Sequence, residues 1–549
     1  MRGLLQDHPL LVTKILDYAA KWHGEQAVVS RMIDGSVVRT TYRELHDRSS
    51  LCTLALQRLG VREGDRVATL AWNTSRHIEA WYGIMGLGAV CHTLNPRLFV
   101  SDLEYIVNHA EDAVLMFDVD LAELVSKLAP KLHTVKTYIM LTDNANMHCA
   151  EMAGLPGTLC YEDLLENEKS RLRSFRWARL EENTACSLCY TSGTTGRPKG
   201  VLYSHRAQFL HSLTVAMADA HCMRSSTCVL AVVPMFHANC WGIIFAAPLV
   251  GAKLVLPGPF LDGASLYRLL EQELCTLSSA VPKVWMGLLQ HLRDTGQRFS
   301  HLKCITTGGS ACPAALIRAF QEEYNVEVRH MWGMTEVCAL GSIAGIKATL
   351  PPATKEEQVA LSLKQGRGTA FVDMRIVDDG GWELPHDGKS RGELQVCGPH
   401  VVRRYYRHEK DAVDSKGWFS TGDIATLDPY GYMQITDRSK DVIKSGGEWI
   451  SSIEIENIAA SHPKVLEAAV IGIPDEKWTE RPLLLAVHRP GEQVSSDELL
   501  TFFQGKIAKW WIPDDVVFVE ELPHTATGKL SKVTLRQQFR NHVPKKSRL

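Results

Sequence analysis

The segment that most constrains the fold runs from Tyr190 to Gly200 and reads YTSGTTGRPKG. The apolar segment before it, Ala185 to Tyr190, predicts a buried strand, and a helix is predicted to follow an N-cap at Ser204. A strand, a glycine-rich loop and a helix in this order are typical of proteins that present backbone N–H groups to phosphate. The glycines permit close approach of the backbone, the hydroxyls donate hydrogen bonds, and Lys199 adds a positive charge. We therefore predict a nucleotide phosphate loop in an α/β protein.

This loop is not a Walker A loop. That motif requires Gly-Lys followed by Ser or Thr, whereas here Pro198 precedes Lys199 and Gly200 follows it. A P-loop NTPase is therefore disfavoured. A solvated turn is also a poor explanation, because the proline and the lysine are too specifically placed for a spacer.

Composition limits the classes of partner. A chain of 549 residues should form a large core and more than one domain. A formal net charge of −2 lacks the excess of positive charge that favours binding to nucleic acid or an anionic membrane. No apolar run reaches the roughly 18 residues of a transmembrane helix. Asp7 and Pro9 interrupt the short apolar start that a signal peptide would need. We expect a cytoplasmic protein.

The cysteines do not indicate a metal site. The chain has 14 of them, scattered through apolar segments, as expected for buried thiols in a reducing compartment. Cys186 and Cys189 form a single CxxC pair, and strand periodicity places their side chains on opposite faces. We expect neither zinc binding nor redox chemistry there.

Further along the chain, predicted strands end in segments suited to a binding site. The predicted strand Val229 to Val233 leads into PMFHANCWG, whose aromatic side chains would suit a pocket wall. The segment Leu302 to Ser310 predicts a strand that ends in glycines, and Val326 to Met331 predicts one that leads into WGMTE. After residue 452, a helix, two strands, a helix and a strand predict a small α+β unit.

Several of these segments resemble motifs of the adenylate-forming enzymes, which include acyl-CoA synthetases, peptide-synthetase adenylation domains and firefly-type luciferases. The matching segments are YTSGTTGRPKG, WGMTE, GWFSTGD (417–423), DRSKDVIKSGGEWISS (437–452) and PHTATGK (523–529). The resemblance covers nearly all of the chain beyond residue 40. It implies a large N-terminal α/β domain of mixed sheets layered with helices (1–437). A small mobile α+β domain (438–549) would follow, with a hinge near Lys440.

The resemblance also implies roles for individual residues. Lys529, Thr335 and Glu336 would stabilise the transition state, and Mg²⁺ would bind at Glu336 and Thr191. Trp332 stands where the family usually has Tyr, and either ring can stack on adenine. The positions that match ATP and AMP contacts are Thr191, Ser192, Gly193, Thr194, Thr195, Gly196, Lys199, Gly308, Gly309, Ser310, Met331, Trp332, Gly333, Thr335, Asp423, Arg438 and Lys444.

The remaining implied roles concern CoA and the acid. The backbone at Gly446 and Gly447 would receive the pantetheine arm of CoA, with Glu448 beside it and Trp449 covering it. The acyl pocket would be walled by three residues of the PMFHANCWG segment, Phe236, His237 and Trp241. His237 is given no acid–base role, because no sequence partner identifies one.

The GGEWISS, IPDD and PHTATG variants resemble one branch of the family, which holds medium-chain fatty acyl-CoA ligases and 3-(methylthio)propanoate-CoA ligases. The resemblance therefore implies formation of acyl-CoA from a carboxylic acid, ATP and CoA through an acyl-adenylate, with release of AMP and pyrophosphate. It also implies acetylation of Lys529 by a lysine acetyltransferase, reversed by a deacetylase, and is compatible with a homodimer.

Three alternatives are weighed against this reaction. A luciferase-like adenylating oxygenase shares all of these motifs. A non-catalytic nucleotide-binding protein would be expected to lack at least one of Lys199, Glu336, Asp423 and Lys529, and all four are present. A peptide-synthetase module would be followed by a carrier domain, for which we expect too few residues after Lys529.

Overall fold

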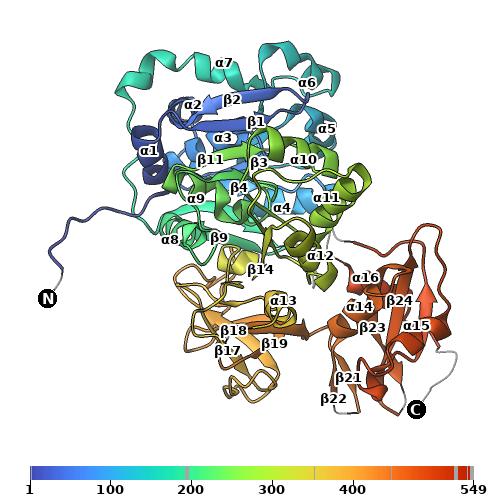
Figure 1. Cartoon of the computed structure of the whole chain (residues 1–549). Helices are drawn as coiled ribbons and strands as arrows, with labels where there is room; N and C mark the ends of the chain where they lie inside the picture. Colours follow the sequence, from blue (N-terminus) through green and yellow to red (C-terminus); the bar gives the residue numbers. More distant parts are fainter. Residues whose placement is uncertain are drawn as a thin grey trace.

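The computed structural model describes residues 1, 3–191, 197–351, 353–446, 448–475, 477–524, 530–540, 542 and 543, with only the backbone of Glu448. Within these ranges the strands form four sheets (Figure 1). Two large sheets and their helices make up the first two thirds of the chain. A third sheet lies below them in the view, and the fourth belongs to the C-terminal unit, drawn in red.

The first large sheet carries the strand that leads into the phosphate loop. Its strands run parallel except for the last, β9, which is antiparallel to β8. In spatial order and within the described residues, they are β7 (Leu159–Cys160), β6 (Thr137–Met140), β5 (Asp112–Phe117), β3 (Arg66–Leu70), β4 (Val90–Thr93), β8 (Ala185–Tyr190) and β9 (Gly200–Ser204). The accompanying helices are α2 (Tyr42–Arg58), α3 (Ser75–Gly86), α4 (Val100–Ala110), α5 (Ala122–Leu128), α6 (His148–Met152) and α7 (Tyr161–Glu166).

The second large sheet carries the strand ends predicted to meet the nucleotide. In spatial order its described strands are β16 (Arg367–Gly368), β15 (Ser342–Ile343), β14 (Glu327–Trp332), β13 (Cys304–Thr307), β12 (Leu277–Ala280), β10 (Cys228–Leu230), β11 (Lys253–Leu256), β1 (Ala27–Arg31) and β2 (Val37–Thr41). The other helices in the first two thirds of the chain are α1 (Val12–Trp22), α8 (His205–Ala216), α9 (Ile243–Val250), α10 (Gly263–Gln272), α11 (Pro282–Thr295), α12 (Ala314–Arg318) and α13 (Lys355–Leu363).

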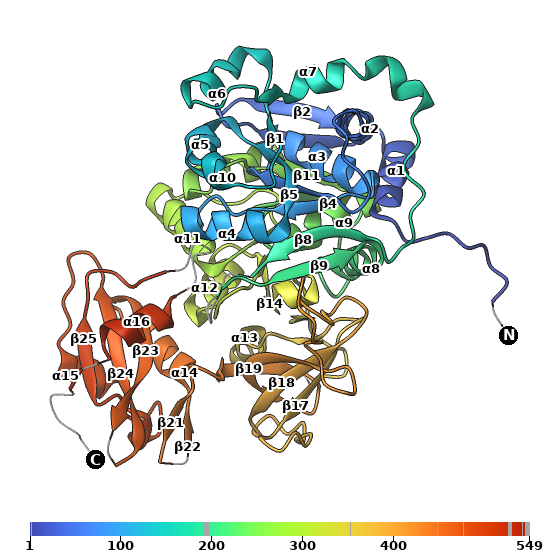
Figure 2. The same ribbon diagram turned by 180° about the vertical axis from the view of Figure 1, so that it is seen from behind.

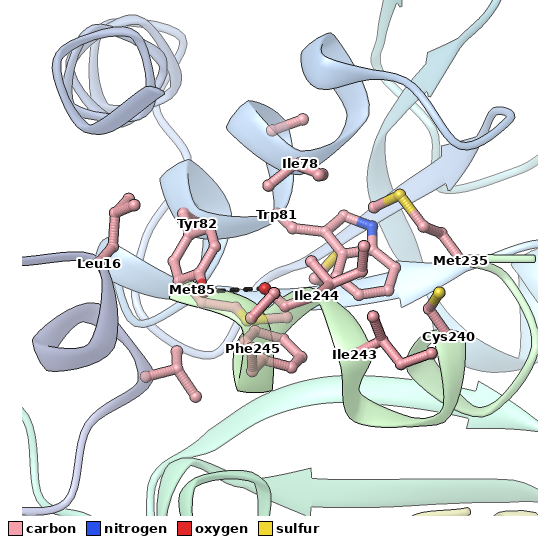
Figure 3. Packing of buried hydrophobic residues seen from close by; sticks show 14 of the residues in the cluster. Leu16, Ile78, Trp81, Tyr82, Met85, Met235, Cys240, Ile243, Ile244 and Phe245 are labelled. Atoms are coloured by element: carbon pink, nitrogen blue, oxygen red, sulfur yellow. Dashed lines mark hydrogen bonds between the residues drawn. The ribbon is translucent and has the colours of Figure 1, made fainter. Parts of the chain in front are cut away.

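A continuous buried cluster joins these two sheets. It contains residues from strands of both sheets and from α1, α2, α3 and α9. At its centre the rings of Trp81 and Phe245 stack with centroids 5.9 Å apart, and the Tyr82 hydroxyl donates to the carbonyl of Ile244 at 3.3 Å (Figure 3). Such pairs contribute stabilisation beyond their buried area. The core therefore fixes α9, and the segment that precedes it, against α3.

The third sheet is antiparallel and consists of β17 (Asp373–Val377), β18 (Gly392–Cys397), β19 (Phe419–Leu427) and β20 (Met433–Arg438) in the described residues. The C-terminal sheet pairs β22 (Glu448–Ile450), β21 (Ile443–Ser445), β24 (Thr479–His488), β23 (Val465–Asp475) and β25 (Asp515–Phe518). It is joined by α14 (Ser452–Ala460), α15 (Ser496–Phe502) and α16 (Lys532–Gln538). Both views show this unit beside the third sheet (Figure 2). The predicted fold class, α/β with layered mixed sheets and a smaller C-terminal α+β unit, is confirmed.

One predicted strand is shorter than expected. The apolar run suggested a strand from Val229 to Val233, but β10 ends at Leu230. Asn73 explains the difference, because its side-chain amide donates to the carbonyls of both Ala231 and Val233, at 2.8 Å each. These carbonyls are therefore satisfied by a side chain from another element instead of a neighbouring strand.

Candidate active site

The base of the phosphate loop is a closed hairpin. Tyr190 and Gly200 pair across β8 and β9. Beyond them the Thr191 N–H donates to the Lys199 carbonyl at 2.9 Å, and the Lys199 N–H donates to the Thr191 hydroxyl at 3.2 Å. The predicted phosphate contacts Ser192, Gly193, Thr194, Thr195 and Gly196 lie outside the described residues. The hairpin therefore positions the two ends of the loop, Thr191 and Lys199, next to each other.

Tyr405 connects the phosphate loop to the predicted magnesium ligand. Its hydroxyl donates to Oε1 of the buried Glu336 at 2.8 Å, and Lys199 Nζ lies 4.8 Å from the centroid of its ring. Burial and the Glu336 carboxylate raise the pKa of Tyr405 above its ordinary value, so the phenol remains a donor. Nearby, the Tyr203 hydroxyl donates to the carbonyl of Thr335 at 2.6 Å. The structure thus brings Lys199, Thr335 and Glu336 together.

The predicted ribose carboxylate is held between two donors. Asp423 is 2% exposed; Arg438 Nε lies 2.8 Å from its Oδ1, and the Trp332 indole N–H donates to its Oδ2 at 2.8 Å. Asp423 and Arg438 are also paired across β19 and β20. Arg438 and Trp332 therefore orient both oxygens of Asp423, which would accept hydrogen bonds from the two adjacent hydroxyls of the ribose. The predicted adenine and ribose residues come together from three strands.

Two predicted nucleotide glycines have a packing reason to be glycine. A Cβ at Gly333 would lie 1.3 Å from the carbonyl oxygen of Ala339, and a Cβ at Gly308 would lie 2.8 Å from that of Met331. Neither position can accept a side chain without displacement of the backbone. Gly308 thus lies against the end of β14, where the predicted ligand residues Met331 and Trp332 are found. Gly309 follows with φ +82°, and Ser310 is exposed.

The predicted acyl wall follows β10. Phe236 and Trp241 are buried, and His237 is half-buried. Trp241 belongs to the same buried cluster as Met331 and Ala339, which come from β14 and from the segment after it. Trp241 and the predicted nucleotide residue Met331 therefore belong to one hydrophobic core. His237 also has an interacting partner.

Residues predicted to contact nucleotide and CoA from the C-terminal unit lie elsewhere in this conformation. Lys444 and Trp449 line a cavity of about 290 Å³. The cavity is also lined by Val377, Asp378, Asp379, Gly381, Glu393, Gln395, Ile424, Ser439 and Val442. Because successive side chains alternate along a strand, Ile424 faces away from Asp423, so the cavity lies on the opposite side of β19. Bringing Lys444 to the nucleotide residues would require movement of the C-terminal unit.

The segment between the third and fourth sheets is short. β20 ends at Arg438 and β21 begins at Ile443, with the predicted hinge residue Lys440 exposed in the intervening turn. At Gly446, a Cβ would approach the Trp478 ring to 2.7 Å, which excludes a side chain there. Gly447, the side chain of Glu448 and the predicted catalytic residue Lys529 lie outside the described residues, so their roles stay predictions.

A buried ionic network ties this turn to α16. Lys532 Nζ lies 2.7 Å from a Glu456 oxygen, and Ser452 donates from its backbone N–H and its hydroxyl to Asp437 at 2.6 and 2.9 Å. Lys532 also donates to the Ser452 hydroxyl. Burial raises the pKa of Glu456 to about 7, although the Lys532 ammonium opposes this shift. Asp437 precedes the turn and Lys532 follows it by almost a hundred residues, so the network spans the predicted hinge.

Removing the ammonium from this network should destabilise the C-terminal unit. We expect Lys532→Met to cost about 3 kcal/mol of unfolding free energy, because a buried carboxyl loses its counter-charge. Loss of the Lys532 ammonium raises the pKa of Glu456 in the folded protein further. Keeping this carboxyl protonated then costs more folding free energy as the pH rises. The deficit should therefore be larger at about pH 8 than at about pH 6. Urea unfolding followed by tryptophan fluorescence at both pH values measures it.

The matched control for this prediction is Lys464→Met in the same unit. Lys464 pairs with Glu498 at 3.0 Å, but both side chains are at least 36% exposed. An exposed pair contributes little to stability, so the midpoint should barely move. Equal effects of the two substitutions would show that the Lys532 network is not buried as described.

Comparison with known proteins places the chain in a family. The AMP-binding enzyme family model matches residues 16–406, and the AMP-binding enzyme C-terminal domain model matches residues 454–529. Among solved structures, an anthranilate CoA ligase in complex with anthranoyl-AMP superimposes with a TM-score of 0.83 at 25% identity, covering 97% of this chain and 98% of that one. ATP-bound MatB from Rhodopseudomonas palustris gives a TM-score of 0.80 at 23% identity, covering 96% and 99% of the two chains, and supports the fold.

Curated relatives match over almost the full length. A 3-methylmercaptopropionyl-CoA ligase from Ruegeria lacuscaerulensis is 46% identical, covering 98% of this chain and 99% of the relative. A medium-chain-fatty-acid–CoA ligase from Ectopseudomonas oleovorans is 44% identical with 98% coverage of both. Over the described residues, no helix is both long and apolar enough to cross a membrane. The matches along the chain show that this protein belongs to the AMP-binding enzyme family, as its phosphate-loop and WGMTE motifs predicted.

Proposed function

We propose that the protein is an ATP-dependent carboxylic acid–CoA ligase that forms an acyl-adenylate, releases pyrophosphate, and then transfers the acyl group to CoA with release of AMP. The observation that carries this proposal is the 44–46% identity, over 98% of the chain, to relatives named as CoA ligases. The convergence of Lys199, Glu336, Asp423 and Arg438 on one region supports it from the structure.

The chemistry explains why these groups are needed. A carboxylate is a poor electrophile, and attack of its oxygen on the α-phosphorus of ATP converts that oxygen into part of a good leaving group. Charge builds on the α-phosphoryl group as pyrophosphate departs, so positioned donors and cations lower the barrier. Lys529 and Thr335 would act on the α-phosphoryl oxygens, while Lys199 and the phosphate loop would hold the β- and γ-phosphates.

Magnesium fits the oxygen groups present. Glu336 supplies a carboxylate whose orientation is fixed by the Tyr405 hydroxyl, and Thr191 supplies a hydroxyl at the base of the loop. Such hard oxygen donors are the ligands that Mg²⁺ prefers. Glu336 and Thr191 would hold the ion, which would neutralise phosphate charge when bound.

The acyl substrate is a medium-chain fatty acid or 3-(methylthio)propanoate. Relatives of 44–46% identity carry both names. The bulk of Phe236 and Trp241 in the proposed wall favours a pocket of moderate length. The test is a panel of carboxylic acids from propanoate to palmitate, together with 3-(methylthio)propanoate, in which CoA-dependent AMP release is measured. Oxygen consumption under air in place of thioester formation would instead indicate an adenylating oxygenase.

Trp241→Ala should shift this preference toward longer acids. Removing the indole opens space in the proposed wall, and each additional methylene that becomes accommodated is worth roughly a tenfold change or more in kcat/KM. We expect the kcat/KM ratio of dodecanoate to hexanoate to rise by at least about tenfold. An unchanged chain-length profile would count against a wall role for Trp241.

The proposal also assigns roles to the two domains, a path for CoA and a cellular location. Residues 1–437 would bind ATP and the acid, and residues 438–549 would rotate about Lys440 between the two half-reactions. CoA would run past Gly446, Gly447, Glu448 and Trp449. The enzyme would act in the cytoplasm in fatty acid metabolism, and could do so as a homodimer.

Acetylation of Lys529 would provide a means of control. The acetyl group removes the positive charge and two of the three ammonium donors, so the α-phosphate would lose a partner. Incubation with a lysine acetyltransferase and acetyl-CoA should stop adenylation, and a deacetylase should restore it. Mass spectrometry locates the modified lysines. Acetylated Lys529 with undiminished adenylation would overturn both the control and the catalytic role.

A further inference from the structure

The wall segment has an unusual backbone. From Ala238 to Gly242 the φ angles are 41, 54, 54, 50 and 80°, so four consecutive non-glycine residues adopt the left-handed conformation. L-residues other than Asn and Asp rarely do so, because Cβ then crowds the following carbonyl. Such a conformation persists only where its surroundings determine it, and it is found most often at functional sites. We call residues 238–242 the left-handed turn.

Asn239 is the residue that anchors this turn. Its side chain is 1% exposed, and its Nδ2 donates to the Ser187 hydroxyl and to Gln208 Oε1, each at 3.0 Å. Its Oδ1 accepts from the Cys189 thiol at 3.3 Å. Asparagine also tolerates the left-handed region better than the other side chains of the turn. Both ends of one amide are thus engaged by β8 and α8.

Packing prevents the turn from relaxing to either side. On one side Cys240 and the first residues of α9 pack into the buried cluster with α3, where Figure 3 shows Cys240 beside Met235 and Ile243. On the other side, a Cβ at Gly242 would lie 2.6 Å from the His211 ring, so only glycine fits there. The turn is therefore held between α3 and α8, and Asn239 fixes its polar contacts.

The hydrogen bonds of Asn239 also connect the left-handed turn to β8, the strand that leads into the phosphate loop. Ser187 and Cys189 are on β8, which ends at Tyr190 at the base of the phosphate loop. Trp241, two residues after Asn239, packs in the cluster that contains Met331. Asn239 thus links the strand of the phosphate loop to the aromatic side chain proposed to limit the acyl chain.

We propose that Asn239 is a positioning residue that sets acyl-chain selectivity: it holds the left-handed turn against β8 and α8 and thereby fixes Trp241 as the end wall for a medium-length acyl group. This inference rests on the proposed acid–CoA ligase function. Asn239 acts through Trp241 and is given no contact with the reacting atoms.

Two substitutions at Asn239 test this role. Asn239→Gly retains access to the left-handed region but removes the anchor. Asn239→Asp retains the size of the side chain, but its second oxygen cannot donate to Gln208 Oε1 and its charge lies in a buried site. We expect each to raise KM for octanoate by about tenfold or more while KM for ATP changes by less than about twofold. The kcat/KM ratio of octanoate to dodecanoate should fall by about fivefold or more.

Ala238→Gly is the matched control, because it places a glycine in the same turn and leaves the Asn239 contacts in place. It should retain the parent KM values and chain-length ratio. Gln208→Ala provides a second route if the Asn239 variants fail to fold, because it removes one acceptor of the amide. Gln208→Ala should lower the octanoate-to-dodecanoate ratio of kcat/KM by a smaller factor than the Asn239 variants do. Where Asn239→Gly folds, adding Gln208→Ala to it should lower this ratio little further.

The outcomes separate this inference from the proposed function. Folded Asn239 variants with the parent chain-length ratio, or with KM for acid and ATP raised equally, would overturn the positioning role while the parent enzyme still makes acyl-CoA. If the Asn239 variants do not fold, a Gln208→Ala enzyme with the parent ratio overturns it. A parent protein that releases no CoA-dependent AMP with any acid of the panel would refute the proposed function, and the inference with it.

Discussion

Lys529→Ala should abolish acyl-adenylate formation while sparing thioester formation from supplied acyl-adenylate. The ammonium would face charge that develops on the α-phosphoryl group only in the first half-reaction. Loss of one such contact is worth roughly 3–4 kcal/mol, or about a hundredfold to a thousandfold in rate. In the second half-reaction the thiol of CoA would attack the acyl carbon of the adenylate, a step that would not need the proposed Lys529 contact.

The two half-reactions can be measured separately for this variant. Pyrophosphate release from ATP and octanoate reports the first, and AMP release from synthetic octanoyl-AMP and CoA reports the second. Lys464→Ala, an exposed lysine of the same unit, is the control and should retain both rates. Equal losses in the two half-reactions of Lys529→Ala would contradict the role assigned to the ammonium.

Lys440→Pro should have the converse effect. Lys440 lies in the turn between β20 and β21, where the N–H groups of Asp441 and Val442 both donate to the Arg438 carbonyl at 2.8 Å. Proline fixes φ near −65° and removes the N–H, so the turn could no longer take up the second arrangement that the proposed domain rotation would require. We expect near-normal pyrophosphate release and a loss of thioester formation of about a hundredfold or more.

The proline effect is distinguished from loss of the charge by Lys440→Ala, which leaves φ free and should retain both rates. Trp449 provides a second readout, because it lines the cavity opposite β17 and β18 in this conformation. Its fluorescence should change when CoA is added to the adenylate-bound parent enzyme, and not in Lys440→Pro. A Lys440→Pro enzyme that makes acyl-CoA at the parent rate would refute the hinge.

Local signals explain how much of the fold could be predicted from the sequence. The strand Ala185–Tyr190 appears with the predicted bounds, and α8 begins after Ser204, whose side chain accepts from the Ala207 N–H. Helix α2 begins with a capping box between Thr41 and Glu44, a spacing that the sequence itself displays. In these cases a short apolar run or a capping side chain decides the structure, and both are visible in the sequence.

Tertiary contacts explain what could not be predicted. Tyr405 connects Lys199 to Glu336 across about two hundred residues of sequence, and nothing in the RRYYR segment around it indicates that contact. Asn239 and Asn73 read as ordinary polar residues in apolar surroundings, and their buried hydrogen bonds appear only in the folded structure. The sequence offered no signal for the Lys532–Glu456 pair, because an isolated lysine near a terminus is usually solvated.

The most direct measurement follows the fate of ATP in the presence of octanoate, first without CoA and then with it. Without CoA, the parent enzyme should release pyrophosphate in an amount matching the active sites and retain octanoyl-AMP. Adding CoA should then give octanoyl-CoA and AMP in equal amounts. Release of ADP and phosphate, or of AMP without any requirement for an acid, would contradict the proposed acyl-adenylate mechanism.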